Sequence, residues 1–174
     1  MSKRLSYVLR HRPESIGIRL DEAGWVPVDD LLAALAAAGL PLTREQLDHV
    51  VAANDKRRFA YDDDGERIRA SQGHSVAVDL GYAPTQPPPV LFHGTADRAV
   101  CSVLAEGLHP GRRHAVHLSC DVATARAVGA RHGRPVVLRV DAVGMAAEGA
   151  VFTRSANGVW LTDAVPARHL AVAG

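Results

Sequence analysis

The chain has 174 residues, of which 47% are hydrophobic and 22% are charged, and its formal net charge is +1 at pH 7. This length and composition exclude a disordered or fibrous chain and suit one domain or two small ones. The balanced charge excludes a general electrostatic attraction to RNA, so a polyanion would have to be bound by a local cluster of arginines. The two cysteines, Cys101 and Cys120, lack CxxC spacing and are expected to be buried thiols.

The N-terminal segment predicts a first helix with one apolar face. Leu5, Val8 and Leu9 fall on that face, at helical spacing. Arg10 and His11 are therefore turned away from it, shortly before a proline ends the segment. We expect these two polar side chains to be presented to a ligand or to solvent.

Two further helices are predicted from their end signals. Asp29 is the expected N-cap of a helix rich in Leu and Ala that stops at Gly39. Thr43 and Gln46 have the spacing of a capping box and predict the start of a third helix. The residues of the third helix that are expected to point inward are Leu47, Val50 and Val51.

A β-hairpin is predicted after these helices. Residues 58–61 and 67–70 have strand composition, and Asp64-Gly65 between them is a hairpin turn signal. Alternation places Arg67 and Arg69 on one face of the second strand, opposite Ile68. Three helices followed by a hairpin is the element order of a winged-helix domain, and a helical domain with a surface hairpin and no nucleic-acid role is the alternative.

A proline-rich stretch predicts a domain boundary. Residues 81–89 contain four prolines, which cannot continue a helix or a central strand. The predicted organisation is therefore an N-terminal domain at residues 1–80, a linker at 81–89 and a C-terminal domain at 90–174.

The C-terminal domain is predicted to be rich in strands. The expected strands are residues 90–92, 115–119, 135–140, 150–153 and 159–162, and the expected helices are residues 97–106 and 121–132. This order predicts an α+β fold built on a twisted sheet, either continuous or split.

Two short histidine motifs are the chemical signals of this half, because the chain has neither GxGxxG nor GxxxxGK[ST]. They are His93-Gly94-Thr95, expected just after a strand, and His117-Leu118-Ser119, expected within or at the end of the next. One interpretation is a two-histidine phosphoesterase, in which one histidine accepts a proton and the other donates one. The other is an ADP-ribosyltransferase cleft, in which the first histidine contacts a ribose and the glycine lets the ligand approach the backbone. The alternative to both interpretations is that the two motifs are ordinary strand-end residues with no catalytic or binding role.

A metal site is not expected. Three histidines lie close together in sequence, but neither an HExxH motif nor a Cys/His quartet accompanies them. These histidines are His109, His114 and His117.

Motifs along nearly the whole chain carry a resemblance to a known family. They lie at residues 5–13, 20–25, 56–59, 67–75, 93–95, 113–119 and 157–162. The strings IRASQGHS at 68–75 and NGVWLT at 157–162 are long and specific. In this order they resemble the KptA-type RNA 2′-phosphotransferases, which remove the splice-junction 2′-phosphate from tRNA in fungi and have bacterial members.

The resemblance implies an N-terminal winged-helix, RNA-binding lobe and a C-terminal ADP-ribosyltransferase-like lobe with a split β-sheet that binds NAD. It places the catalytic residues of the family on Arg10, His11, Arg69 and Arg113. The residues placed at the NAD site are His93, Gly94, Thr95, His117, Leu118 and Ser119. Three guanidiniums suit a terminal phosphate, because planar forks bind its oxygens bidentately and stay charged at any working pH.

The implied reaction consumes NAD in two steps and needs no metal. The RNA 2′-phosphate first attacks the nicotinamide-bearing ribose carbon and expels nicotinamide. The ribose 2″-hydroxyl then attacks the phosphate, releasing RNA with a free 2′-hydroxyl and ADP-ribose 1″,2″-cyclic phosphate. The expected RNA is tRNA-like, and we expect a cytoplasmic monomer without a membrane segment.

The sequence departs from patterns of related enzymes at three positions, and two other functions are alternatives to the implied one. Ala115 stands where many relatives have histidine, and Ser71 stands where asparagine is common. Val159 occupies the motif in which protein-modifying ADP-ribosyltransferases carry a catalytic glutamate, which argues against protein modification. The rivals are an enzyme that leaves ADP-ribose on a terminal phosphate of a nucleic acid and a winged-helix sensor of NAD or ADP-ribose without turnover.

Overall fold

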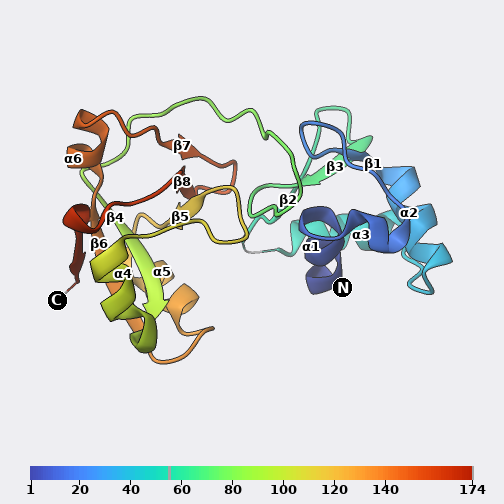
Figure 1. Cartoon of the computed structure of the whole chain (residues 1–174). Coiled ribbons are helices and arrows are strands. Elements are labelled where there is room, and N and C mark those ends of the chain that lie inside the picture. Colours follow the sequence, from blue (N-terminus) through green and yellow to red (C-terminus); the bar gives the residue numbers. More distant parts are fainter. Residues whose placement is uncertain (55, 174) are drawn as a thin grey trace. The chain divides into compact units, whose positions relative to one another are not determined.

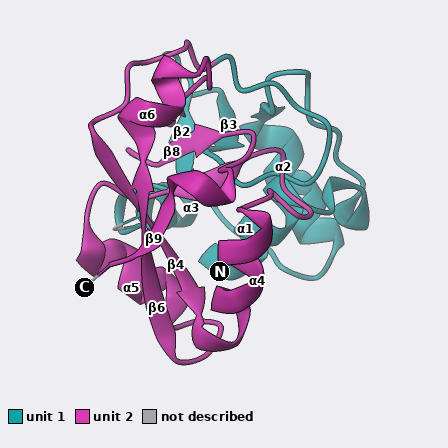
Figure 2. Ribbon diagram, turned by 60° about the vertical axis from the view of Figure 1, so that its left-hand side comes forward, with its two compact units in different colours: residues 1–81 teal, residues 82–174 magenta. Residues whose placement is uncertain are grey.

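The computed structural model describes residues 1–54 and 56–173. The chain divides into two compact units, Met1–Gly81 and Tyr82–Gly174, which Figure 2 shows in different colours. Each has its own cluster of buried apolar side chains, so each is described by itself. The architecture is α+β, with short helices and small antiparallel sheets (Figure 1).

The N-terminal unit places three helices around a small antiparallel sheet. Its elements are α1 (Ser2–Arg10), η1 (Pro13–Ile16), β1 (Val26–Pro27), α2 (Val28–Ala37), α3 (Arg44–Ala52), β2 (Phe59–Tyr61) and β3 (Arg67–Ala70). The strand order is β1-β3-β2, and both pairings are antiparallel. The helices bury Leu5, Leu9, Leu31, Leu35 and Leu47 completely against Ile68 of the central strand. β3 is thereby fixed as the central strand that carries Arg69.

Several local predictions for this unit are confirmed. The Thr43 hydroxyl accepts from the Gln46 amide, and the Gln46 side chain accepts from the Thr43 amide, which completes the capping box. Leu47 is buried, whereas the other inward positions of α3 are half-buried. Ile68 is buried and its neighbours Arg67 and Arg69 are not, as strand alternation requires.

The prediction for the start of α2 is wrong. The helix begins at Val28, with Pro27 as its N-cap residue and no side-chain cap. Asp29 lies within the first turn, where a carboxylate is favourable to the helix dipole but does not define the end. Val28 is buried, so apolar packing sets the start of the helix here.

The C-terminal unit contains two three-stranded antiparallel sheets. Its elements are β4 (Val90–Ala96), η2 (Asp97–Ala99), α4 (Val100–Glu106), β5 (Val116–Leu118), α5 (Val122–Gly129), β6 (Pro135–Asp141), α6 (Ala142–Ala147), β7 (Thr153–Arg154), β8 (Trp160–Thr162), η3 (Ala167–His169) and β9 (Leu170–Val172). The strand orders are β4-β6-β9 and β5-β8-β7. Phe92 of β4 and Ser119, just after β5, exchange backbone hydrogen bonds of 2.9 and 2.8 Å, which connect the two sheets.

Some boundaries in this unit differ from the sequence predictions. The strand expected at residues 150–153 is reduced to Thr153–Arg154, and α6 and β9 were not predicted at all. His93, Gly94 and Thr95 lie inside β4 rather than after it. The proline-rich segment expected as a linker packs on this unit, because Thr85 donates to the Phe152 carbonyl and Ala142 donates to the Pro89 carbonyl. These features depend on tertiary contacts.

The two cysteines are thiols as predicted, but the prediction that they are buried is wrong. Cys101 and Cys120 are both free and exposed. The indole Nε1 of Trp160 donates to Cys120 Sγ at 3.1 Å. Among the described residues, no helix is long and apolar enough to cross a membrane.

Candidate active site

The C-terminal end of α1 presents Arg10 and His11 to the segment that follows β3. The Ser75 amide donates to the Arg10 carbonyl at 2.9 Å, a group that the helix end leaves without an intrahelical partner. The Ser75 hydroxyl lies 3.0 Å from His11 Nδ1. This hydrogen bond engages Nδ1 and orients the imidazole ring.

A single carbonyl group connects Arg10 with the end of β3. Arg10 Nη2 donates to the Arg58 carbonyl at 3.5 Å. The backbone amide of Ser71, the residue after β3, donates to the same carbonyl at 2.8 Å. The chain that leaves β3 therefore reaches the end of α1 directly, and this brings the Arg10-His11 motif to the strand that carries Arg69.

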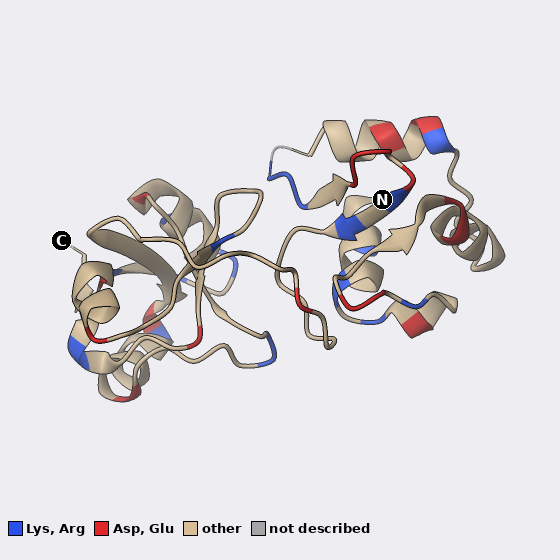
Figure 3. Ribbon diagram, turned by 90° about the horizontal axis from the view of Figure 1, so that it is seen from above, with Lys and Arg blue, Asp and Glu red and all other residues tan. Residues whose placement is uncertain are grey.

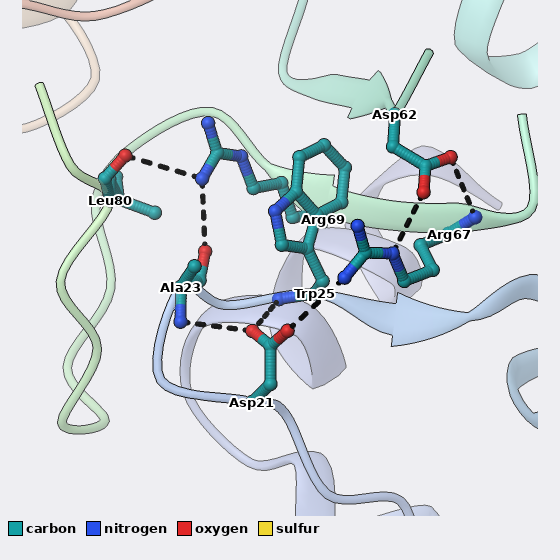
Figure 4. A network of polar contacts seen from close by, with 7 residues as sticks. All are labelled: Asp21, Ala23, Trp25, Asp62, Arg67, Arg69 and Leu80. Carbon is teal, nitrogen blue, oxygen red and sulfur yellow. Dashed lines mark hydrogen bonds and ion pairs between the residues drawn. The ribbon is translucent and has the colours of Figure 1, made fainter. Parts of the chain in front are cut away.

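Arg69 is held by two carbonyls and an aromatic ring (Figure 4). Its Nη1 donates to the Ala23 carbonyl at 3.0 Å and to the Leu80 carbonyl at 3.3 Å. Its guanidinium carbon lies 4.3 Å from the centroid of the Trp25 ring, which is within cation–π range. These partners fix the plane of the guanidinium.

Asp21 orders the turn that supplies the Ala23 carbonyl and the Trp25 ring. Its Oδ1 accepts from the amides of Ala23 and Trp25 at 2.9 and 2.8 Å. Gly24 in this turn has φ +81°, a conformation that a side chain makes costly. The other carboxylate oxygen of Asp21 lies 3.7 Å from Arg67 Nη1. This turn therefore fixes the carbonyl and the ring that contact the Arg69 side chain.

Two histidines of the C-terminal unit are oriented by backbone carbonyls. His93 Nδ1 lies 3.1 Å from the His117 carbonyl, and His117 Nδ1 lies 3.0 Å from the Ala115 carbonyl. A carbonyl only accepts, so each Nδ1 carries a proton that it donates. Burial lowers the pKa of His93, and the positive charges of Arg113 and His132 lower it further. His93 is therefore neutral at pH 7 and suited to accept a hydrogen bond from a ribose hydroxyl.

The other residues of the two histidine motifs have structural roles that the sequence did not reveal. A Cβ on Gly94 would lie 1.7 Å from the Ala125 carbonyl oxygen, so the glycine is required for the packing of α5 on β4. Leu118 is buried, and the backbone of Ser119 pairs with Phe92. Thr95 is half-buried in the same strand.

Arg113 lies in the exposed loop that precedes β5. Its amide donates to the Pro110 carbonyl at 3.1 Å, which closes a turn in this loop. Desolvation lowers the pKa of Arg113, and the like charge of Arg131 lowers it further, although the guanidinium remains charged at neutral pH. Arg113 and Arg131 together make this part of the C-terminal unit electropositive and suited to an anionic group.

The structure brings the predicted residues together within each unit. Arg10, His11 and Arg69 are connected through Ser75, the Arg58 carbonyl and β3 in the N-terminal unit. His93, His117 and Arg113 belong to the C-terminal unit, where the charge of Arg113 acts on His93. Among the described residues, no group of three or more His, Cys, Asp or Glu side chains is placed to hold a metal ion.

Sequence reasoning assigned no role to Ser75 or Trp25. Both lie in strings that carry the family resemblance, but a serine and a tryptophan have no spacing rule that connects them to a distant histidine or arginine. Only the fold shows that Ser75 contacts His11 and that Trp25 lies against Arg69.

Comparison with known proteins gives a consistent result over nearly the whole chain. Residues 1–164 match the family model described as RNA 2′-phosphotransferase, Tpt1 / KptA family. A protein of Agrobacterium fabrum, named probable RNA 2′-phosphotransferase, is 61% identical over 171 residues, covering 98% of this chain and 92% of its own length. Proteins of the same name from Streptomyces coelicolor and Acaryochloris marina are 61% and 50% identical, over 98% and 97% of this chain and 92% and 93% of their own lengths.

Proposed function

The chain belongs to the RNA 2′-phosphotransferase, Tpt1 / KptA family, and from this premise we propose that it removes a 2′-phosphate from RNA by an NAD-consuming, two-step reaction. NAD supplies an electrophilic ribose carbon with nicotinamide as its leaving group. The products are RNA with a 2′-hydroxyl, nicotinamide and ADP-ribose 1″,2″-cyclic phosphate. The expected RNA is tRNA-like.

The observation that carries this proposal is the way Arg69 is held. Two carbonyls and the Trp25 ring orient its guanidinium, and each of these partners is neutral. A guanidinium oriented in this way offers a fixed fork with a full positive charge, which matches the geometry and charge of a terminal phosphate. Arg10, at the end of α1, is connected to the same strand through the Arg58 carbonyl and would add a second fork.

His11 would act on the same phosphate. Ser75 engages Nδ1, so Nε2 is the nitrogen that would contact a phosphate oxygen or transfer a proton. In the second step the RNA 2′-oxygen leaves phosphorus and must gain a proton, and His11 is our candidate for its donor.

The residues of the C-terminal unit fit a nucleotide ribose. The accepting Nε2 of neutral His93 suits a ribose hydroxyl, because that hydroxyl can donate. We propose that His93 holds the nicotinamide ribose of NAD and that His117 acts beside it. Arg113 would stabilise the negative charge that grows on the phosphoryl oxygens in the second step.

We also propose specific architectures for the two units. Three helices and a β-hairpin support a winged-helix assignment for the N-terminal unit. Two three-stranded sheets joined at Phe92 and Ser119 support an ADP-ribosyltransferase-like, split-sheet assignment for the C-terminal unit.

The test is turnover of a synthetic RNA oligonucleotide that carries a single 2′-phosphate, with NAD and EDTA present. We expect nicotinamide and the cyclic phosphate to appear in equal amounts with the 2′-hydroxyl RNA. The matched controls are the same oligonucleotide without the 2′-phosphate and the Arg69→Ala variant.

Other product patterns would point to the rival functions. ADP-ribose that remains attached to a 5′-phosphorylated oligonucleotide, with no reaction at the 2′-phosphate, would indicate a terminal-phosphate ADP-ribosyltransferase. NAD binding without release of nicotinamide would indicate a sensor. Activity that EDTA abolishes and a divalent ion restores would indicate a metal-dependent phosphoesterase.

A further inference from the structure

The outer face of α1 is basic and carries an exposed aromatic ring. Leu5, Val8 and Leu9 bury the inner face of this helix. Lys3, Tyr7 and Arg10 are spaced by four and three residues, so they line up on the opposite face. Residues 1–12 contain no acidic residue. This face is therefore unusual in a chain whose net charge is only +1.

Tyr7 presents an aromatic ring to solvent on this face. It is 42% exposed and is the one aromatic side chain among the exposed large hydrophobic residues of the described chain. Its described ring contact is with Arg4, whose guanidinium carbon lies 5.7 Å from the ring centroid. An exposed tyrosine flanked by cations is the composition of a platform on which a nucleic-acid base stacks.

A second basic segment, residues 56–58, is connected to α1. Asn54 Nδ2 donates to the Ser2 hydroxyl at 3.1 Å, and the Arg58 carbonyl accepts from Arg10 Nη2. This connection places residues 56–58 near α1. Figure 3 shows the Lys and Arg residues of both segments in blue. The sequence resemblance included this segment, but the proposed reaction gives it no role.

The backbone at Arg57 is held in a costly conformation. Arg57 has φ +40°, the only positive φ among the described non-glycine residues. Its amide donates to the Asn54 carbonyl at 2.7 Å, and its carbonyl accepts from the Ser71 hydroxyl at 2.8 Å. Such conformations persist only where their surroundings enforce them, and they are concentrated at functional sites. Arg57 is exposed and belongs to the segment that Asn54 and Arg58 connect to α1.

We propose that the α1 surface, formed by Lys3, Arg4, Tyr7, Lys56 and Arg57, binds single-stranded RNA next to the 2′-phosphate. Tyr7 stacks on one base, and the cations neutralise backbone phosphates. From Lys3 to Arg10 the helix rises about 10 Å, which matches about three stacked nucleotides at roughly 3.4 Å each. This inference rests on the proposed function, since Arg10 and His11 lie at the end of the same helix.

The experiment compares two substrates that carry the same 2′-phosphate, a dinucleotide and a single-stranded 12-mer. Tyr7→Ala removes the ring, Tyr7→Phe keeps it, and Arg57→Asn removes the charge with a residue that tolerates positive φ. We expect Tyr7→Ala to raise the KM for the 12-mer about tenfold, with kcat and the dinucleotide parameters unchanged. Tyr7→Phe should behave as wild type. Arg44→Gln is the matched charge control, because Arg44 pairs with Asp48 on α3.

Direct binding separates this inference from the proposed function. Fluorescence anisotropy with a 12-mer that lacks the 2′-phosphate measures RNA binding without the contact to that group, and the Tyr7 and Arg57 variants isolate the part that the α1 surface contributes. For Arg57→Asn, the slope of log Kd against log salt should fall by about 0.7 for the lost phosphate contact. If Tyr7→Ala and Arg57→Asn bind this 12-mer as wild type does, or if Tyr7→Ala weakens dinucleotide turnover equally, the α1 surface proposal is overturned while the proposed function stands. If the wild type binds the 12-mer through these residues but releases no nicotinamide, the proposed function fails and the α1 surface remains.

Discussion

Two neighbouring arginines of β3, Arg67 and Arg69, have different kinds of partner. Arg67 and Arg69 project from the same face of the strand, and their guanidinium carbons lie 5.6 and 4.3 Å from the centroid of the same Trp25 ring (Figure 4). Arg67 pairs with Asp62 at 2.8 Å and with Asp21 at 3.7 Å. Arg69 Nη1 is instead held by the carbonyls of Ala23 and Leu80.

This difference separates an arginine that supports the fold from one that is suited to a ligand. The hydrogen bonds from the Arg67 amide and guanidinium hold the pKa of Asp62 below its usual range. The Asp62 carboxylate is therefore ionised and offsets the positive charge of Arg67. The carbonyls around Arg69 orient the side chain through neutral groups. Surface ion pairs such as Arg67 with Asp62 contribute little to stability, whereas an oriented cation can bind an anion strongly.

The largest effect on the reaction is expected from substitutions of Arg69. Arg69→Ala should lower kcat/KM for the 2′-phosphorylated oligonucleotide about a thousandfold, because one preorganised donor group of the transition state is lost. Arg69→Lys should recover little, since lysine keeps the charge but lacks the planar fork. Arg67→Ala is the matched variant on the same strand and should stay within about twofold of wild type. Near wild-type rates for Arg69→Lys would remove Arg69 from the phosphate site.

A somewhat smaller effect is expected for Arg113, which lies in the other unit. Nicotinamide departure is driven by the cationic pyridinium, whereas the second step must stabilise additional charge on phosphorus. Arg113→Ala should therefore slow the second step about a hundredfold and the first step less. Rapid-quench analysis of a labelled oligonucleotide should then show the RNA-phosphate-ADP-ribose intermediate. Slow loss of substrate with no intermediate would assign Arg113 to binding or to the first step.

A change of about tenfold is expected when the support of Arg69 is removed. Trp25→Leu keeps an apolar side chain but loses the cation–π contact, so kcat/KM should fall about tenfold. Trp25→Phe keeps an aromatic face and should recover most of that loss. The thermal midpoint of each variant, measured by circular dichroism, distinguishes loss of orientation from loss of folding. Equal rates for the leucine and phenylalanine variants would show that the ring does not orient Arg69.

The smallest effect is expected from pH, through His93. Its pKa is lowered below the ordinary value of 6.5, so the neutral, accepting ring persists as pH falls through 6.5. The kcat/KM for NAD should stay within about twofold between pH 7.5 and 6.5 and then fall about tenfold per pH unit below the folded-state pKa. Folding is weakened as pH falls from 6.5 towards the folded-state pKa, because the unfolded chain binds the proton first, so stability is followed in parallel.

The Arg113→Ala variant sharpens this measurement. It removes one of the positive charges that lower the pKa of His93, so the acid limb should move to higher pH. If the kcat/KM for NAD of the wild type already falls tenfold per pH unit above pH 6.5, the neutral, carbonyl-bound state of His93 is contradicted.

The sequence was most informative where a local rule controls the structure. The capping box of Thr43 and Gln46, the alternation at Ile68 and the hairpin order depend on neighbours within a few residues, and the fold has them as expected. The family was also recognisable from the sequence, and the match over residues 1–164 confirms it. The catalytic roles of Arg10, Arg69 and Arg113 stay predictions.

Only the tertiary structure decided which partners hold these residues. Ser75 is 64 residues from His11, and Ala23 is 46 residues from Arg69, so no periodicity connects them. Gly94 was interpreted as an opening for a ligand, but the α5 backbone occupies the space of its Cβ. The sequence by itself therefore determined the local elements and the chemical groups, because both are properties of nearby residues. The orientation of those groups comes from carbonyls and rings that chain folding brings from distant positions, and only the tertiary structure determines these contacts.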